Sequence, residues 1–276
     1  MPQAVADKRA LSPREIRKIV RERFLHPRKA ETLYQRKLSA VGRQVGFIVK
    51  QFAPEGKVHD MPTLISTLLR YADELKPWAK EVTQAMHFDV YRRDAKSWFD
   101  LSREMGRTLR KEIMAAPVGK TLRGLMNEQV DLITSLPRDA AKRVHSLALE
   151  TLTATAGRAD ELTKEILRSG QVSVGRAKLI ARTETSRTAA LLQEARAKYV
   201  GSESYTWRTS RDADVRPAHR KLEGKTFRWD DPPIADESGI RANPGTIWNC
   251  RCWAEPLLPE KNAEAHPSLQ SPHHSR

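Results

Sequence analysis

The sequence predicts a mainly α-helical N-terminal region followed by a small α+β domain, in which a helix packs on a short antiparallel sheet. Three observations lead to this prediction. Apolar residues at helical spacing, with few turn residues between them, run through the first 168 residues. Alternating, β-prone segments begin only after residue 203. Four of the six tryptophans fall within residues 207–253, which indicates that the C-terminal domain has the denser core.

Capping residues and prolines set the expected helices of the N-terminal region. Ser12-Pro13-Arg14-Glu15 has the pattern of a capping box, with proline at the first helical position, so a first helix begins there. Asp60-Met61-Pro62 begins a third helix. Its apolar stripe consists of Leu64, Leu68, Tyr71 and Leu75. The other expected helices cover residues 31–52, 79–115, 118–135 and 138–168, with breaks at Pro117, Pro137 and Gly157.

The C-terminal domain is expected to begin with one long helix and to continue with three short strands. Gly170-Gln171-Val172-Ser173 marks the boundary, with Ser173 as the N-cap of a helix that Gly201 ends. The expected strands cover residues 204–209, 225–229 and 247–253. The chain is thus divided into a helical region (1–169), an α+β domain (170–258) and a Pro/His/Ser-rich tail expected to be disordered (259–276).

The charge of the chain favours a polyanionic partner. The net charge is +15, and residues 1–169 carry 32 Lys and Arg against 21 Asp and Glu, whereas residues 170–276 carry 17 against 13. Nucleic acid is the first candidate, and an acidic protein partner is the alternative. No apolar run approaches the length of a membrane span, and the first residues do not resemble a secretory signal. Two cysteines one residue apart exclude a disulfide framework, so we expect a soluble protein made in a reducing cytoplasm.

Special residues gather in the C-terminal third, and both cysteines of the chain lie there. Cys250 and Cys252 follow His219 by 31 and 33 positions. The whole pattern consists of Arg182-Thr183-Glu184, Trp207, Asp212, Arg216, His219, Leu222, Gly224, Pro244-Gly245 and Asn249-Cys250-Arg251-Cys252. It resembles the C-terminal domain of phage Mu F-like proteins, which are minor head (head morphogenesis) proteins of tailed bacteriophages.

The resemblance implies a minor capsid protein that is incorporated in few copies during procapsid assembly. Such a protein contacts the portal protein and the exit route of the packaged genome, inside the virion head near the portal, and is made in the host cytoplasm. The basic helical region would then contact the portal, capsid or scaffold proteins, or double-stranded DNA without sequence preference. No membrane partner is expected.

His219, Cys250 and Cys252 are candidate zinc ligands, and we expect them to lie close together with Trp207 or Trp248 packed nearby. A structural zinc site takes four N or S ligands, and Asp212 or Asp214 could supply a fourth ligand here. Some members of the resembled family have Cys-x-x-Cys where this chain has residues 216–219, and a His where it has Ile247. We therefore expect no metal or other cofactor, and buried cysteines packed with Trp248 and Trp253.

An enzymatic site is the remaining alternative. Asp212, Asp214, Arg216 and His219 could belong to a hydrolytic site, as in a DNA-processing enzyme or toxin that uses Asp212 and His219. A zinc-dependent nucleic-acid-binding module is a further alternative. We instead expect Asp212 to form an Asx-type turn or to accept from backbone N–H groups and from Arg216.

The other charged residues of the pattern have an ordinary helical explanation. Glu184 and Arg187 have the spacing of an i,i+3 pair, which we expect to hold the long helix to the sheet, with Arg182 as a structural residue beside them. The sequence contains no glycine-rich phosphate loop, no nucleophile elbow and no His-Glu-x-x-His motif, so we expect a structural protein and not an enzyme.

Overall fold

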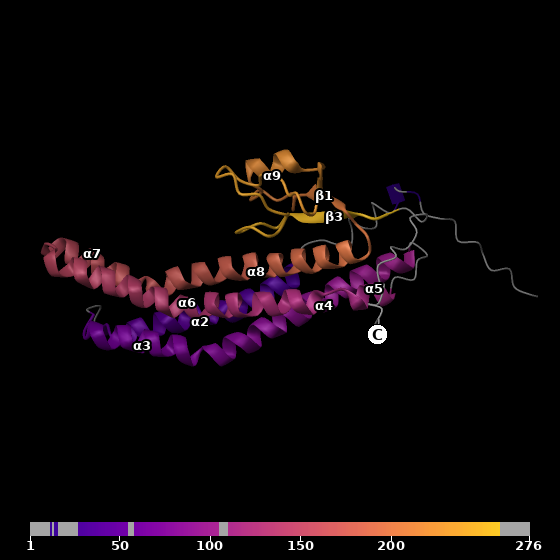
Figure 1. The fold of residues 1–276 in the computed structure, drawn as a ribbon. Coiled ribbons are helices and arrows are strands. Elements are labelled where there is room, and N and C mark those ends of the chain that lie inside the picture. Colours follow the sequence, from indigo (N-terminus) through magenta and orange to yellow (C-terminus); the bar gives the residue numbers. More distant parts are fainter. Residues whose placement is uncertain (1–11, 13, 16–26, 55–57, 105–109, 260–276) are drawn as a thin grey trace, which may run out of the picture.

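The computed structural model describes residues 12, 14–15, 27–54, 58–104 and 110–259. An elongated bundle of helices carries a small α+β unit on one side, beside the C-terminal half of helix α8 (Figure 1). The expected fold class is therefore confirmed. The tail from residue 260, for which the sequence predicts disorder, lies outside the described residues.

The helices are α2 (Arg28–Gln51), α3 (Met61–Glu74), α4 (Lys76–Glu104), α5 (Arg110–Ala115), α6 (Val118–Thr153), α7 (Ala156–Leu167), α8 (Ser169–Tyr199) and α9 (Pro217–Leu222). The strands are β1 (Ser204–Arg208), β2 (Thr226–Arg228) and β3 (Trp253–Leu257). Strand β1 lies in the centre of the sheet and is antiparallel to both neighbours. No helix in the described part of the chain is long and apolar enough to cross a membrane.

Two of the expected helix starts are confirmed by their capping hydrogen bonds. The Ser12 backbone N–H donates to the Glu15 carboxylate at 2.8 Å, and the Glu15 N–H donates to the Ser12 hydroxyl at 3.3 Å. The continuation of that helix lies outside the described residues. The Asp60 side chain accepts from the Thr63 N–H at 3.1 Å at the start of α3. A carboxylate in this position satisfies one of the free donors of the first turn.

Two of the expected helix breaks are wrong. Helix α6 continues through Pro137, and the next break occurs at residues 154–155, so that Gly157 lies in the first turn of α7. Proline removes one backbone donor but does not forbid a helix whose two flanking turns are held by packing. Leu136 and Val144, on either side of Pro137, are both buried in the bundle, which keeps α6 continuous.

The expected boundary at Gly170 is a close contact between two antiparallel helices. Helix α8 begins at Ser169, and Ser173, the expected N-cap, is buried inside it. A Cβ added to Gly170 would lie 2.3 Å from the Gly46 Cα, and one added to Gly42 would lie 2.6 Å from the Val174 backbone N. These glycines let the backbones of α2 and α8 approach each other. Gly201, with φ +88°, ends α8 as expected.

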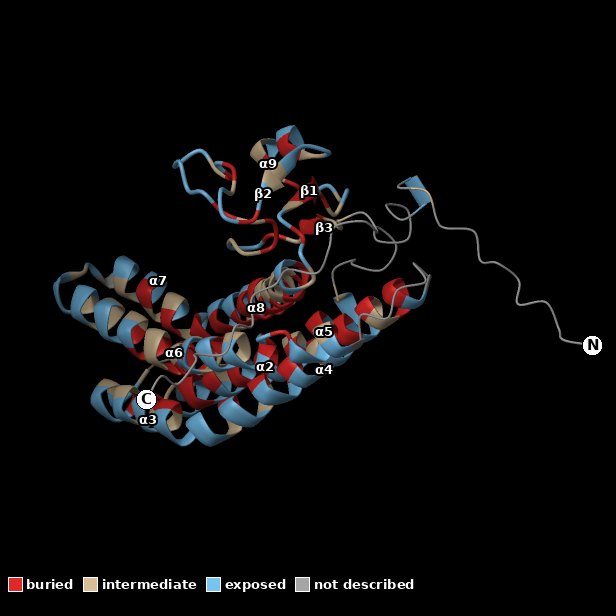
Figure 2. Ribbon diagram, turned by 45° about the vertical axis from the view of Figure 1, so that its right-hand side comes forward, coloured by how far each residue is buried: buried red, intermediate tan, exposed pale blue. Residues whose placement is uncertain are grey.

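The α+β unit and one end of the bundle share a hydrophobic core. Trp98 of α4 and Ile113 of α5 belong to the same buried cluster as Tyr205 and Trp207 of β1. Figure 2 shows buried residues on the inward faces of the helices and in the strands β1 and β3. The sheet is therefore fixed to the bundle by shared apolar packing as well as by the chain connection after α8.

Candidate functional site

The two cysteines lie in a loop and not in the strand that the sequence predicts for residues 247–253. Strand β3 begins only at Trp253. Asn249 has a left-handed backbone (φ +55°), and the Cys250 N–H donates to the Ile247 carbonyl at 3.3 Å, which closes a turn. A left-handed residue interrupts an extended strand, and Asn tolerates this conformation better than most residues. We call residues 247–252 the cysteine loop.

Helix α8 holds the cysteine loop in place through two neighbouring residues. The Arg182 guanidinium donates to the Asn249 side-chain oxygen at 2.8 Å. The Asn249 backbone N–H donates to the Thr183 hydroxyl at 3.0 Å. Arg182 and Asn249 both belong to the sequence pattern described above, and the structure brings them together.

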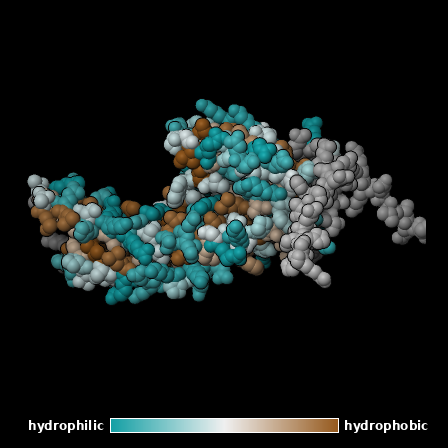
Figure 3. Space-filling model, in the orientation of Figure 1, coloured by the Kyte–Doolittle hydropathy of each residue, from teal (hydrophilic) through white to brown (hydrophobic). Residues whose placement is uncertain are grey.

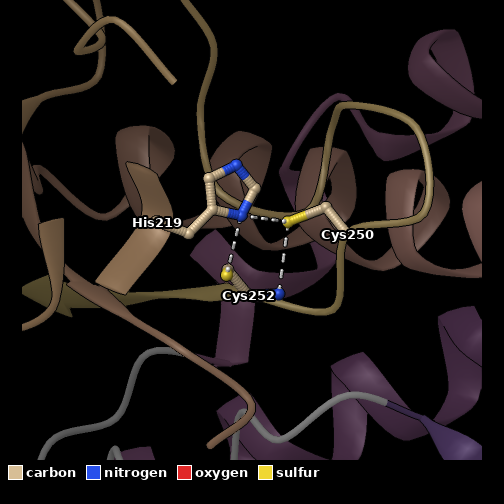
Figure 4. A group of neighbouring side chains, drawn as sticks. All are labelled: His219, Cys250 and Cys252. Carbon is tan, nitrogen blue, oxygen red and sulfur yellow. Dashed lines mark hydrogen bonds between the residues drawn. The ribbon is translucent and has the colours of Figure 1, made fainter. Parts of the chain in front are cut away.

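His219 lies directly beside both cysteines, as predicted (Figure 4). Its Nδ1 is 3.6 Å from the Cys250 Sγ and 3.5 Å from the Cys252 Sγ, and all three residues are buried. The Cys252 backbone N–H faces the Cys250 Sγ at 3.4 Å. Pro217 starts the short helix α9 that carries His219, while the loop carries the cysteines. The site therefore joins segments about 30 residues apart in the sequence.

One of the two tryptophans expected near the cysteines is elsewhere. The Trp207 ring packs edge-on against the His219 ring with centroids 5.4 Å apart, and Trp253 is buried in the same cluster as the cysteines. Trp248 is 52% exposed, so the prediction that it packs on the cysteines is wrong. Asn249, between Trp248 and Cys250, has a left-handed backbone. The chain turns there, so the side chains of Trp248 and Cys250 point in different directions.

The two thiols have different proton affinities. A hydrogen bond with Cys252 and the nearby His219 hold the pKa of the Cys250 thiol well below its usual range, although burial opposes this shift. The hydrogen bond with Cys250, together with burial, raises the pKa of the Cys252 thiol.

A small pocket opens beside the three side chains, and charged residues line its mouth. These residues are Arg182, Asp212, Asp214, Arg216 and Arg251. Asp212 accepts from Arg251 at 3.1 Å, whereas Arg216 donates to the Trp248 carbonyl at 2.6 Å. The expected pairing of Asp212 with Arg216 is therefore wrong.

The expected Asx-type turn at Asp212 is present. Partial burial raises the pKa of Asp212, but hydrogen bonds from Ser210, from Arg251 and from the backbone of Asp214 outweigh it, and the pKa lies below its usual range. The carboxylate therefore remains charged and fixed on these partners. Asp212 thus acts as an anchor for the cysteine loop through Arg251.

Glu31 of α2 is a residue of this region that the sequence analysis missed. Its carboxylate lies 3.6 Å from the Arg182 guanidinium and 3.5 Å from that of Arg251. It connects the first helix of the bundle to the cysteine loop. An acidic residue in the first turn of a helix is common, so the sequence carries no signal for this contact.

Glu184 faces the interior of the bundle and not the sheet. The Gln129 side chain of α6 donates to the Glu184 carboxylate at 2.9 Å and to Thr188 at 3.1 Å, and His87 of α4 lies 2.6 Å from the Gln129 oxygen. Burial raises the pKa of Glu184. The expected i,i+3 pair with Arg187 is present at 3.7 Å, but Glu184 holds α8 to α6. Gln129 and His87 were not identified from the sequence, since their partners lie on other helices.

The glycines of the pattern allow tight turns around the site. Gly224 has φ +78° and donates from its N–H to the Trp207 carbonyl at 2.9 Å. Gly245 has φ +84°, and a Cβ there would lie 2.9 Å from the Cys252 carbonyl oxygen. Pro244, which precedes it, is buried. Only glycine fits both requirements at position 245, since a side chain would be strained and would collide with the backbone.

Comparisons with known proteins found one family model and a relative. Residues 148–255 match the family model described as phage Mu protein F like protein. An uncharacterized protein of Haemophilus influenzae is 30% identical over 129 residues, which is 47% of this chain but 28% of that protein. This chain thus spans little more than a quarter of that relative's length. No solved structure matches the chain. The family match includes the whole of α7, α8 and α9 and the residues around the cysteine loop other than Glu31, so this part of the chain is similar to the phage Mu protein F-like family.

Proposed function

We propose that this protein is a minor head protein of a tailed bacteriophage, incorporated in few copies during procapsid assembly. The observation that carries the proposal is the similarity of residues 148–255 to the phage Mu protein F-like family. This similarity covers the α+β unit together with α8, the helix that connects the unit to the rest of the bundle. The family suggests association with the virion, and we propose in addition that the protein contacts the portal protein.

The shape and surface of the bundle support a contact with another assembly protein. The bundle extends well beyond the α+β unit at the end where α6 and α7 meet (Figure 1). Hydrophobic side chains are exposed there (Figure 3), and Leu149 and Leu152 near the end of α6 are 54% and 81% exposed. Exposed leucines one helical turn apart, at the tip of an elongated body, are suited to docking on a portal, capsid or scaffold protein.

The charge distribution supports an additional contact with packaged DNA. The helical region 1–169 holds most of the positive excess of the chain. Neutralisation of phosphates by Lys and Arg gives binding without sequence preference. A protein beside the exit route of the genome would meet DNA at high local concentration, so weak binding is sufficient for this role.

The contacts of the charged motif residues also agree with a structural role. Asp212 is fixed by Arg251, Arg182 by Asn249, and Glu184 by Gln129. These contacts orient the cysteine loop and the helices. We therefore propose that the charged residues of the pattern hold the fold and that head assembly needs no turnover by this protein.

Co-assembly with the phage proteins tests this function. We would express the full chain with the portal and major capsid proteins of the same phage, purify procapsids, and quantify each protein by mass spectrometry. The expected result is a small, fixed number of copies per particle that depends on the portal. A Leu149→Glu/Leu152→Glu variant should fold but lose incorporation, and a Leu69→Glu variant, altered at another exposed leucine, should retain it. Absence of the wild-type protein from purified particles would overturn the proposal.

A further inference from the structure

Three soft donor atoms point toward one location between α9 and the cysteine loop (Figure 4). They are the Nδ1 of His219 and the Sγ atoms of Cys250 and Cys252, which all lie within 4.8 Å of one another. We propose that these three residues bind one Zn²⁺ ion, with the fourth coordination position facing the adjoining pocket. This inference is independent of the proposed head-assembly role.

The separations of the donor atoms fit a single tetrahedral ion. Zn–S bonds of about 2.3 Å and Zn–N bonds of about 2.0–2.1 Å place tetrahedral N and S ligands about 3.6 Å apart. The two N···S distances here are 3.6 and 3.5 Å. Two thiolates and an imidazole are also the ligand types that select zinc over hard cations such as Mg²⁺ or Ca²⁺. The His219 nitrogen is thus separated from each sulfur as an edge of a zinc tetrahedron requires, and the two sulfurs lie within 4.8 Å of each other.

Both sulfurs approach the same nitrogen. A neutral imidazole nitrogen has one lone pair, so Nδ1 can accept from only one of the two thiols at a time. The second sulfur nevertheless approaches to nearly the same distance, in a buried position. A cation at the common centre would use the lone pair of Nδ1 and both sulfurs at once.

The charges and protons balance in the bound state. Zn²⁺ displaces one proton from each thiol, and the two resulting thiolates neutralise the ion. His219 binds through the lone pair of Nδ1 and keeps its proton on Nε2. The buried site therefore has no net charge when loaded, which lowers the cost of placing the ion next to the apolar rings of Trp207 and Trp253.

The surrounding contacts position the ligands before metal binds. Helix α8 fixes the cysteine loop through Arg182 and Thr183, and the Cys252 N–H points at the Cys250 sulfur, where it would stabilise a thiolate ligand. Asp212 lines the same pocket, but its carboxylate is held by Arg251. We therefore assign the fourth position to a water molecule that enters through the pocket, and not to Asp212.

A closed structural zinc site takes four protein ligands, and the sequence offers only three, which is why it predicts no metal. A site with three protein ligands and one open position is the arrangement typical of zinc sites that bind an exogenous ligand. The sequence shows which residues are present, but the separations of their donor atoms appear only in the fold. Arg216 and Ile247 offer no zinc-binding atom, so the fourth position stays open toward the pocket.

Metal analysis of the full chain tests the site. The protein would be purified with a phosphine reductant, stripped with a chelator, reloaded with Zn²⁺ and desalted, and its zinc content measured by elemental mass spectrometry. We expect about one zinc per chain for the wild type, and loss of most of it in Cys250→Ser, Cys252→Ser and His219→Gln. His145→Gln, which changes an exposed histidine of α6, should bind as the wild type does.

Two further measurements on the wild type test the zinc site even if a ligand variant fails to fold. Zn²⁺ should raise the Tm of the stripped wild type, because it binds the folded state, and should leave the Tm of any folded ligand variant unchanged. Co²⁺ added to the stripped wild type should give the intense near-ultraviolet charge-transfer absorption of cobalt–thiolate bonds. Reduced, folded wild type that gains neither zinc nor the cobalt–thiolate band would overturn the site, as would zinc that all three ligand variants retain.

Discussion

Arg182 and Asn249 form the direct link between the helical bundle and the cysteine loop, with the guanidinium 2.8 Å from the amide oxygen. The contact joins the middle of α8 to the left-handed residue that turns the loop. Arg182 also lies 3.6 Å from Glu31 and 3.8 Å from Asp214, so one side chain connects α2, α8 and two loops of the α+β unit. The position of both cysteines therefore depends on a residue of the bundle.

Replacing Arg182 should loosen the cysteine loop without unfolding the bundle. Loss of a charge-assisted hydrogen bond weakens a local contact by roughly 1.5–3 kcal/mol, which increases local opening about tenfold or more. We expect Arg182→Gln to accelerate labelling of Cys250 and Cys252 by a thiol reagent by about that factor, measured on chelator-stripped protein.

Arg187→Gln is the matched control for this experiment. Arg187 lies on the same helix with nearly the same side-chain exposure (29% against 28%) but pairs with Glu128 and Glu184, away from the loop. Its replacement should leave the labelling rate unchanged. Equal acceleration in both variants would mean that thiol access follows global stability and not the Arg182 link.

Glycine at position 170 should be essential for the packing of α2 against α8. In Gly170→Ala the new Cβ would lie 2.3 Å from the Gly46 Cα, which is a backbone atom that cannot rotate away. Overpacking of this kind costs typically 1–3 kcal/mol or more. We expect a clear fall in the midpoint of urea unfolding for this variant.

Gly175→Ala in the same helix provides the comparison. A Cβ at Gly175 meets nothing within 4 Å, and alanine has the higher helix propensity by about 1 kcal/mol. This substitution should leave the unfolding midpoint unchanged or raise it. A destabilisation of similar size at both positions would show that helix propensity, and not the contact with Gly46, decides the effect at Gly170.

Local signals in the sequence predicted much of the fold, and partners distant in sequence decided the rest. The helix starts at Ser12 and Asp60 depend on side chains within three residues, so their patterns were sufficient. Pro137 and Ser173 were misinterpreted because packing of α6 and α8 against other helices overrides the local preference. The strand expected at residues 247–253 is also overridden by distant partners. The segment is β-prone, but Arg182 and Thr183 of α8 hold it in a loop.

The site shows the same division. The proximity of His219 to the cysteines followed from a turn-rich motif closing on itself, and the structure confirms it. The pairing of Asp212 with Arg251, the role of Glu31 and the network around Gln129 each involve residues 39 or more positions apart, or on different helices. Charged residues offer many possible partners, and their spacing in the sequence does not choose among them.

The buried pair of Asp94 and Arg196 should make stability depend on pH. Burial raises the pKa of Asp94 to about 6, and the Arg196 guanidinium 2.5 Å away offsets only part of this shift. The folded state thus holds a proton on Asp94 more tightly than the unfolded chain does. This contribution to stability is fully present below the unfolded pKa near 4 and is lost as the pH rises through about 6.

We expect the free energy of unfolding of the wild type, relative to Asp94→Asn, to fall by up to about 3 kcal/mol between pH 4 and pH 7. Asparagine keeps the shape of the side chain and does not titrate. Urea unfolding at a series of pH values measures the difference. Asp89→Asn, on the same helix and paired with Arg93 at the surface, should track the wild type. A difference between wild type and Asp94→Asn that is constant or rises with pH would contradict the raised pKa.

The basic helical region should bind DNA weakly, without sequence preference and with strong dependence on salt. Each phosphate neutralised by Lys or Arg releases counterions, so the logarithm of affinity falls with the logarithm of salt with a slope of about 0.9 per contact. The full chain is the proper sample, because α8 packs directly against α2 and completes the bundle.

Arg43 and Lys50 are exposed on α2 seven residues apart, which places them on one face of the helix. We expect Arg43→Gln/Lys50→Gln to lower the affinity for unrelated duplexes equally and to reduce the salt slope by up to about 2. Lys221→Gln/Lys225→Gln removes the same charge from exposed positions of the α+β unit and should change neither quantity. Equal losses in both variants would mean that net charge and not the α2 face governs binding. Absence of binding by the wild type at low salt would assign the positive excess to an acidic protein partner.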